Sequence, residues 1–174
     1  MAKIKVMAIA PYEGLLELMN KTAKNYEDQI EITAVIGDLS DGVKFAKAAE
    51  EDGYDIIISR GGTSEMIMKE VSIPVVNIEV SGYDYMRTIK IAQNFSGRPA
   101  MVGFAYITKG AMSVNNLLKT DIKIITIETL DEITSLLKQL NEEGYSLIIG
   151  DVATERTARE MGLNGMLLTS GEES

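Results

Sequence analysis

Segments with strand character and segments with helix character alternate along nearly the whole chain. Short apolar runs are followed by longer stretches in which apolar residues recur at helical spacing. This alternation is typical of parallel sheets covered by helices, so we expect an α/β fold. The predicted strands are Ile4–Ala10, Glu31–Ile36, Asp55–Ser59, Val75–Ile78, Ala100–Ala105, Ile122–Ile127, Ser146–Ile149 and Gly165–Leu168. The predicted helices are Tyr12–Asn25, Asp41–Glu51, Glu65–Val71, Tyr83–Asn94, Ala111–Lys119 and Leu130–Glu143.

The two halves of the sequence resemble each other. The stretch Glu51–Ile58 is similar to Glu142–Ile149, and Val80-Ser81-Gly82 is echoed by Thr169-Ser170-Gly171. Such a repeat predicts two similar lobes of the flavodoxin or Rossmann kind, each with a parallel sheet of about four strands. Because open α/β sheets bind ligands beyond the carboxyl ends of their strands, we expect a ligand groove between the lobes.

A break in the helical pattern suggests where the lobes divide. Ser96, Gly97 and Pro99 interrupt it, which predicts an N-terminal lobe over residues 1–96 with its crossover helix and a C-terminal lobe over 97–174. The final residues, Ser170 to Ser174, resemble the start of another helix. We therefore expect the second lobe to be cut before a last helix.

Composition excludes several classes of function. The net charge of -9 and pI near 4.6 disfavour direct contact with nucleic acid or with an anionic membrane. The chain has no cysteine and no histidine, which removes disulfides, thiol nucleophiles, Ser-His catalysis and the usual transition-metal ligands. We expect no cofactor and no metal. A secretion signal and a membrane-length apolar run are both missing from the sequence, which predicts a cytoplasmic protein.

The most informative motif is Arg60-Gly61-Gly62-Thr63-Ser64, which follows an apolar strand and precedes a helix. Backbone N–H groups at the start of such a helix point toward one spot and attract anions. Arg60 adds a fork of donors that matches a carboxylate or phosphate. Alternatively, Arg60 pairs with a nearby carboxylate, the glycines only shape a turn, and Thr63 or Ser64 caps the helix. We expect Thr63 to contact the ligand.

Further candidate ligand contacts follow other strands. Pro11, Tyr12 and Glu13 come after the first strand, which a flavodoxin-like order places beside Arg60. Ser81, Gly82 and Tyr83 follow the fourth strand, where a plain helix cap is an equally good interpretation. In the second lobe, the segments Thr108-Lys109-Gly110 and Gly150-Asp151 are also expected after strands, although solvated turns explain them as well.

The blocks Ile58–Glu65, Val71–Val76 and Ile78–Asp84 resemble the N-terminal sensor domain of propionate-catabolism activators. The similarity extends more loosely through Gly144–Gly171. It implies a two-lobed receptor, not an enzyme, that senses a small organic acid such as a methylcitrate-like tricarboxylate. It also implies a regulator that works with the sigma-54 form of RNA polymerase, in which ligand relieves inhibition of an ATPase module that is followed by a DNA-binding module.

The resemblance does not remove the alternatives. No Gly-x-x-x-x-Gly-Lys-Ser/Thr phosphate loop occurs in the sequence, so ATPase chemistry cannot lie in these residues. An enzyme that acts on a phosphorylated or carboxylated metabolite is conceivable, with Tyr12, Glu13, Glu79 or Asp84 as proton-transfer groups that nothing in the sequence orients. A phosphoacceptor receiver domain would need an aspartate at the end of the third strand, where this sequence has Ser59-Arg60. A dimerisation module without ligand remains open, and a homodimer is compatible with sensing.

Overall fold

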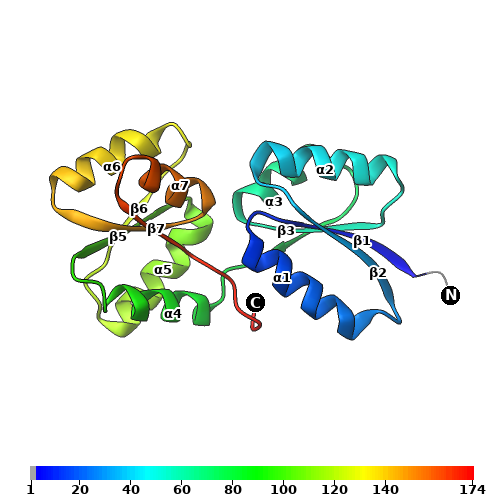
Figure 1. Ribbon diagram of the computed structural model, residues 1–174, viewed down its shortest axis with the longest axis horizontal. Helices are drawn as coiled ribbons and strands as arrows, with labels where there is room; N and C mark the ends of the chain where they lie inside the picture. Colours follow the sequence, from blue (N-terminus) through cyan, green and yellow to red (C-terminus); the bar gives the residue numbers. More distant parts are fainter. Residues whose placement is uncertain (1–2) are drawn as a thin grey trace. The chain divides into compact units, whose positions relative to one another are not determined.

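The computed structural model describes residues 3–174, and these divide into two compact units between Glu79 and Val80. Each unit contains one four-stranded sheet in which every strand pair is parallel. Helices follow the strands and cover the sheets (Figure 1). This arrangement confirms the predicted α/β fold with two similar lobes.

The first lobe has the strand order β2-β1-β3-β4, which is the predicted flavodoxin-like order. The apolar run Ile56–Ile58 forms the first part of β3, as expected from the preference of β-branched residues for strands. The elements of this lobe are β1 (Ile4–Ala10), α1 (Glu13–Ala23), a 3-10 turn (Lys24–Tyr26), β2 (Ile30–Ile36), α2 (Leu39–Glu51), β3 (Ile56–Arg60), α3 (Gly61–Met68) and β4 (Val75–Ile78).

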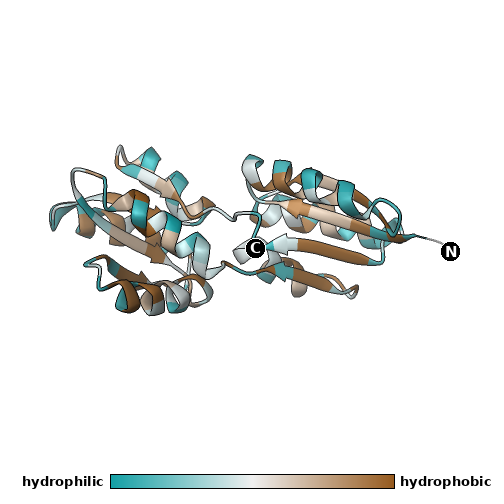
Figure 2. Cartoon of the chain, turned by 90° about the horizontal axis from the view of Figure 1, so that it is seen from below, coloured by the Kyte–Doolittle hydropathy of each residue, from teal (hydrophilic) through white to brown (hydrophobic). Residues whose placement is uncertain are grey.

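The first sheet buries its two faces against different helices. Successive residues of a strand point to opposite faces. Met7 and Ile9 of β1 therefore pack with α2 and α3, whereas Ala8 and Ala10 pack with Leu15 of α1. The strands are mainly apolar and the helices alternate between apolar and polar residues (Figure 2). This pattern is expected of a sheet enclosed by amphipathic helices.

The second lobe repeats the plan with the order β6-β5-β7-β8. Its core joins Met101 and Ile149 of the sheet to Tyr85 and Ile89 of α4 and to Ile107 of α5. On the other face, α6 and α7 supply buried residues. The elements are α4 (Gly82–Ala92), β5 (Arg98–Gly103), α5 (Ala105–Leu118), β6 (Lys123–Thr126), α6 (Glu132–Glu142), β7 (Tyr145–Gly150), α7 (Val152–Glu160) and β8 (Asn164–Leu167).

The division between the lobes differs from the boundary predicted after residue 96. The chain passes into the second unit at Val80, before α4, because Tyr85, Ile89 and Ala92 of that helix are buried in the core of the second lobe. The sequence break at Ser96–Pro99 marks only the turn between α4 and β5. α4 thus follows the last strand of the first lobe in the sequence but packs in the core of the second lobe.

Several helices differ from the prediction. α3 begins at Gly61, four residues before the predicted Glu65, and α5 begins at Ala105 rather than Ala111. Gly61, Gly62 and Thr63 lower helix propensity in the first turn of α3, and Thr108 and Gly110 lower it in the first two turns of α5, which conceals these starts in the sequence. α7 was not predicted, because its sequence VATERTARE carries few apolar residues at helical spacing. Asp151 caps it by accepting a hydrogen bond from the Thr154 amide.

Candidate functional site

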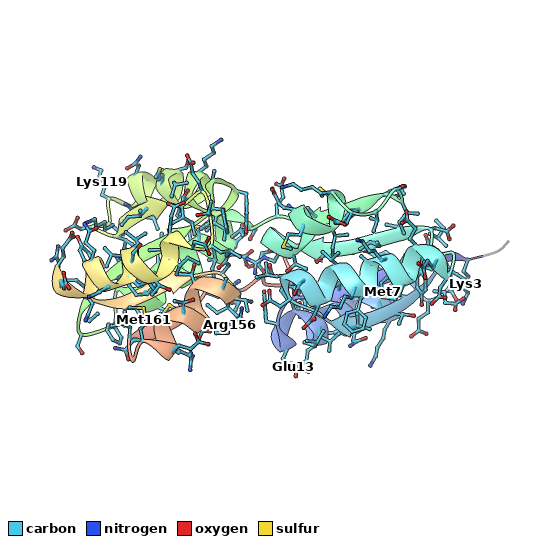
Figure 3. The ribbon with its side chains drawn as sticks, turned by 90° about the horizontal axis from the view of Figure 1, so that it is seen from above. Lys3, Met7, Glu13, Lys119, Arg156 and Met161 are labelled. Carbon is cyan, nitrogen blue, oxygen red and sulfur yellow. The ribbon has the colours of Figure 1, made fainter. Side chains whose placement is uncertain are left out.

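Three helices begin at the carboxyl edge of the first sheet. Each follows its strand directly, so the N-termini of α1, α2 and α3 lie at the same edge, and Glu13 in Figure 3 marks the first turn of α1. In none of the three does the side chain of the N-cap residue itself accept a hydrogen bond from the helix. The partial positive charges of the helix ends therefore gather at this edge. α1 and α2 carry Glu13 and Asp41 in their first turns, whereas α3 carries no acidic residue there.

Arg60 occupies the N-cap position of α3. An arginine side chain has only donors, so it cannot accept a hydrogen bond from the helix amides as Asp, Asn, Ser or Thr would. It places a full positive charge beside the positive end of the helix dipole. The alternative that Thr63 or Ser64 forms the cap is therefore wrong. Gly61 follows with φ of 59°, a left-handed conformation that favours glycine, whereas Gly62 has no positive φ.

The guanidinium of Arg60 is held by the loop after β1. Its Nη1 donates to the Tyr12 hydroxyl over 2.9 Å, and its Cζ lies 5.7 Å from the centre of the Tyr12 ring. Only 7% of Arg60 is exposed. This contact confirms that the Pro11–Tyr12 loop lies beside Arg60, as the pairing of β1 with β3 requires. The burial shows that Arg60 is an internal part of the edge rather than a surface charge.

Thr63 and Ser64 are buried in the first turn of α3. The Thr63 hydroxyl accepts a hydrogen bond from the Leu39 amide over 2.9 Å and so satisfies a first-turn amide of α2. Ser64 is 0% exposed, and its Oγ has no hydrogen-bond partner in the described part of the chain. Buried hydroxyls are nearly always paired, so the Ser64 Oγ is a polar group that remains to be satisfied.

One contact at this edge escaped the sequence analysis. Asn77 of β4 accepts a hydrogen bond from the Gly61 amide through its Oδ1, over 3.1 Å. It pins the strand-to-helix turn, and a half-buried asparagine in the otherwise apolar strand Val75–Ile78 was the signal that could have revealed it. With Gly61 engaged, the next amides of α3, those of Gly62 and Thr63, are the donors at the helix end that no side chain caps.

Ser81 lies in the second unit as the N-cap of α4, which confirms the helix-cap interpretation. Its Oγ accepts from the Asp84 amide, and the Asp84 carboxylate accepts from the Ser81 amide over 2.9 Å. Burial alone would raise the pKa of Asp84. Hydrogen bonds from Ser174, Ser81 and Gly171 outweigh it and hold that pKa below its ordinary value. Asp84 is therefore a structural carboxylate rather than a proton-transfer group.

The predicted second-lobe segment Thr108-Lys109-Gly110 does not lie in a loop after a strand. These residues belong to α5. Thr108 is buried, and its hydroxyl contacts the Phe104 carbonyl oxygen at 3.3 Å and the Thr126 hydroxyl at 2.6 Å. Lys109 is exposed on the helix. Asp151, by contrast, does follow its strand, and it places a carboxylate where the first lobe has Arg60.

The edge of the first sheet therefore combines the elements that bind an anion. A buried guanidinium, a helix N-terminus whose N-cap residue accepts no hydrogen bond and a buried hydroxyl without a partner among the described residues all belong to the start of α3. Carboxylates and phosphates accept hydrogen bonds from all three kinds of donor. Among the described residues, no group of three or more Asp or Glu side chains could hold a metal ion.

Comparison with known sequences decides the family. The profile of a family described as propionate catabolism activator matches residues 26–174. The chain belongs to this propionate catabolism activator family. A crystal structure of an NtrC family transcriptional regulator from Clostridium acetobutylicum is 30% identical, with a TM-score of 0.83 over 99% of this chain and 91% of that one. A comparison with curated proteins gave no match.

Other solved structures are more distant from this propionate catabolism activator domain. The transcription regulator CcpA of Lactococcus lactis is 13% identical with a TM-score of 0.46, over 94% of this chain and 75% of that chain. An ABC domain in complex with L-Trp from Streptococcus pneumonia is 10% identical with a TM-score of 0.48, over 91% and 71%. In residues 3–174, the helices are too short or too polar to cross a membrane.

Proposed function

We propose that this domain is the small-molecule sensor of a sigma-54-dependent transcriptional activator, and that an organic acid anion binds at the carboxyl edge of the first lobe. Membership of the propionate catabolism activator family supports a regulatory role. The proposed ligand belongs to the methylcitrate-like carboxylates that the family resemblance implies. The proposed setting is the cytoplasm, where the domain acts on ATPase and DNA-binding modules elsewhere in the protein.

The observation that carries the proposal is Arg60 at the N-cap of α3. A buried guanidinium stands beside the positive end of α3, and a carboxylate can accept hydrogen bonds from both the guanidinium and the helix amides. We propose that the ligand carboxylate contacts Arg60 and the amides of Gly62 and Thr63. Ser64 and the Pro11-Tyr12 loop then line the same edge.

The proposed contacts are confined to the first lobe for a physical reason. The hydroxyls of Ser81 and Thr108 are engaged in hydrogen bonds within the second lobe, and Lys109 is exposed on α5. The corresponding turn of the second lobe carries Asp151, which already caps its own helix. A carboxylate ligand is repelled by Asp151 and attracted by Arg60.

The ligand acts in this proposal by shifting a population. It relieves inhibition of the ATPase module only as far as it binds the active arrangement better than the inactive one. A shift from one part in a hundred to ninety-nine requires about 5.5 kcal/mol of differential affinity. A single carboxylate held by Arg60 and two amides supplies only part of this, so further ligand groups must contribute.

Thermal unfolding in the presence of organic acids tests the binding site. We expect one class among methylcitrate, citrate, propionate and inorganic phosphate to raise the melting temperature of the domain. A ligand at a hundred times its dissociation constant adds about 2.7 kcal/mol of stability. Arg60→Ala should abolish this shift, because it removes the guanidinium that meets the carboxylate.

Arg98→Ala is the matched control, because it removes the same charge from an exposed arginine that stacks on Tyr145 in the second lobe. It should leave the shift intact. An unchanged shift in Arg60→Ala disproves the proposed site. No shift with any acid favours a dimerisation module, which the solution mass would then reveal, and conversion of a bound acid to product would favour an enzyme.

A further inference from the structure

The second unit carries a groove that plays no part in the proposed anion site. The groove has a volume of about 480 Å³ and runs along α4, which shares one face of the second sheet with α5 (Figure 1). Its lining comes from α4, from the end of α5 with the residues after it, and from the segment after β8, all within the second unit. This volume lies within the range of about 300–1,000 Å³ that is usual for small-molecule sites.

Much of this lining is apolar. Tyr83 and Met86 of α4 line the groove, and Leu118 lines it at the end of α5. Tyr83 is 64% exposed and Leu118 is 42% exposed, whereas Ile89, which also lines the groove, is buried. At 1.5 Å of rise per residue, the stretch from Tyr83 to Gln93 extends about 15 Å, which is long enough for an extended acyl chain. A hydrocarbon chain in the groove removes this exposed apolar surface from water.

The groove is also basic. Arg87 and Lys90 are three positions apart on α4, so their side chains leave the helix on the same side, and both line the groove. Besides them, α4 and α5 carry only Lys109 and the buried Asp84 as charged residues. The chain as a whole has a net charge of -9. A local positive site in an acidic protein attracts an anion.

A carboxylate of the chain itself already lies in this groove. Glu173, in the segment after β8, pairs with Nη1 of Arg87 over 2.7 Å. The two side chains are 34% and 38% exposed, so water and dissolved anions compete for the pair. Lys90 is exposed and forms no ion pair with another described residue. The Glu173 carboxylate thus shows the chemistry that the groove accepts, and Lys90 offers a second cation beside it.

We propose that this groove binds a medium-chain carboxylate, which is an organic anion with an extended apolar body. Lys90 and Arg87 hold its carboxylate, because ammonium and guanidinium groups both donate to carboxylate oxygens. The hydrocarbon chain lies against Tyr83, Met86 and Leu118. A short acid leaves these apolar side chains in water, and an uncharged chain does not engage the two cations, so the groove selects for both features.

This site goes beyond the proposed sensing site, because Arg60 belongs to the first unit and every residue of the groove belongs to the second. The bound carboxylate competes with Glu173 for Arg87. The segment after β8 stays attached through Asp84, which accepts a hydrogen bond from the Gly171 amide over 2.8 Å. Displacement of Glu173 therefore removes one contact of this segment without detaching it.

Titration of the 174-residue domain with octanoate, followed by amide NMR spectra, tests the proposal. Octanoate should shift the amide signals of Lys90 and Leu118. It should bind at least about ten times more tightly than butyrate, because each additional buried CH₂ group tightens binding by about two- to fourfold. Octylamine carries the same chain with a positive charge, and it should bind at least about ten times more weakly than octanoate because the two cations repel it.

Three variants assign the contacts. Lys90→Glu should weaken octanoate binding at least about tenfold, because it replaces an attractive charge with a repulsive one. Lys138→Glu is the matched control, since it makes the same charge change at an exposed lysine of α6, which covers the other face of the sheet. It should leave the dissociation constant unchanged. Glu173→Gln should tighten binding about two- to threefold, because Arg87 then loses the carboxylate that competes with the ligand.

The contrary outcomes are equally definite. The proposal is overturned if octanoate does not bind, if octylamine binds as well as octanoate, or if Lys90→Glu leaves the affinity unchanged. Weaker binding in Glu173→Gln also overturns it, since Glu173 would then hold the ligand rather than compete with it. Arg60→Ala should leave octanoate binding intact. Shifts confined to the first unit and lost in Arg60→Ala would assign octanoate to the other site, so the two proposals fail separately.

Discussion

Asp84 shows how one buried side chain holds the start of the second lobe. It is 0% exposed and accepts hydrogen bonds from the amides of Ser81 and Gly171. Arg87 lies next to it on α4 and forms an ion pair with it. Because these donors favour the charged form, they depress the pKa of Asp84 more than burial raises it. A group of this kind stabilises the fold only while it is ionised.

We predict that Asp84→Asn lowers the free energy of unfolding by about 2 kcal/mol at pH 7, because an amide cannot accept from every donor that Asp84 satisfies. The folded pKa lies below the unfolded value of about 3.9, so the contribution is complete above that value and disappears as the pH falls through the folded pKa. Denaturant unfolding at pH 7 and at pH 3 measures the change.

The difference between wild type and Asp84→Asn should thus shrink in acid. Asp41→Asn is the control, because Asp41 is exposed in the first turn of α2 and pairs with Lys44 along the same helix. It should change stability by less than about 0.5 kcal/mol. A pH-independent difference for Asp84→Asn would contradict the role assigned to the carboxylate.

At the scale of single residues, the sequence predicted positions better than contacts. A flavodoxin-like order correctly brought Tyr12 to Arg60, because neighbouring parallel strands end at the same edge. It did not predict that Arg60 itself is the N-cap or that Thr63 bonds to Leu39. Those contacts depend on where α3 begins, and Gly61 and Gly62 disguise that start as a loop.

At the scale of elements, corresponding strands of the two lobes have different surroundings. Ile58 and Ile149 occupy equivalent positions on β3 and β7, yet α4 covers Ile149 while Ile58 stays half-buried. The hydrophobic gain of a side chain follows the apolar area that it removes from water. Ile149 therefore contributes more to the free energy of unfolding than Ile58, although the two residues are equivalent in the repeat.

We predict that Ile149→Ala costs about 3–4 kcal/mol and Ile58→Ala about 1–2 kcal/mol in the 174-residue chain. Loss of a fully enclosed side chain leaves a cavity, whereas a half-exposed site lets water fill the space. Urea unfolding followed by circular dichroism measures both variants. Equal costs would contradict the difference in burial between Ile58 and Ile149.

Most helices and strands could be predicted from the sequence because their apolar residues recur with a clear period. The prediction missed a helix that lacks this periodicity. α2 and α6 have apolar stripes, and both were predicted within a few residues. α7 has little apolar surface and is defined by the cap at Asp151. The repeat between β3 and β7 predicted two lobes, but the repeat alone does not say which core α4 joins.

At the scale of the whole molecule, the position of α4 decides what an independent lobe contains. The second unit begins at Val80, and α4 contributes Tyr85, Ile89 and Ala92 to its core. Burial of a large apolar side chain contributes about 1.5–3 kcal/mol. Tyr85 and Ile89 together thus contribute about 3–6 kcal/mol, which is comparable with the whole stability of a small domain.

We therefore predict that a fragment of residues 80–174 folds, whereas a fragment of residues 97–174 does not. Without α4, Leu147, Ile149 and Leu168 lose the part of their cover that Tyr85, Ile89 and Ala92 supply, and the sheet exposes apolar surface to water. Thermal unfolding by circular dichroism should show a cooperative transition for the longer fragment alone, and a hydrophobic dye should bind the shorter one. Ile89→Ala in the fragment of residues 80–174 should lower its melting temperature without abolishing the cooperative transition. If residues 97–174 fold cooperatively and gain nothing from α4, the boundary lies after residue 96 as the sequence break suggested, and α4 belongs to the first lobe.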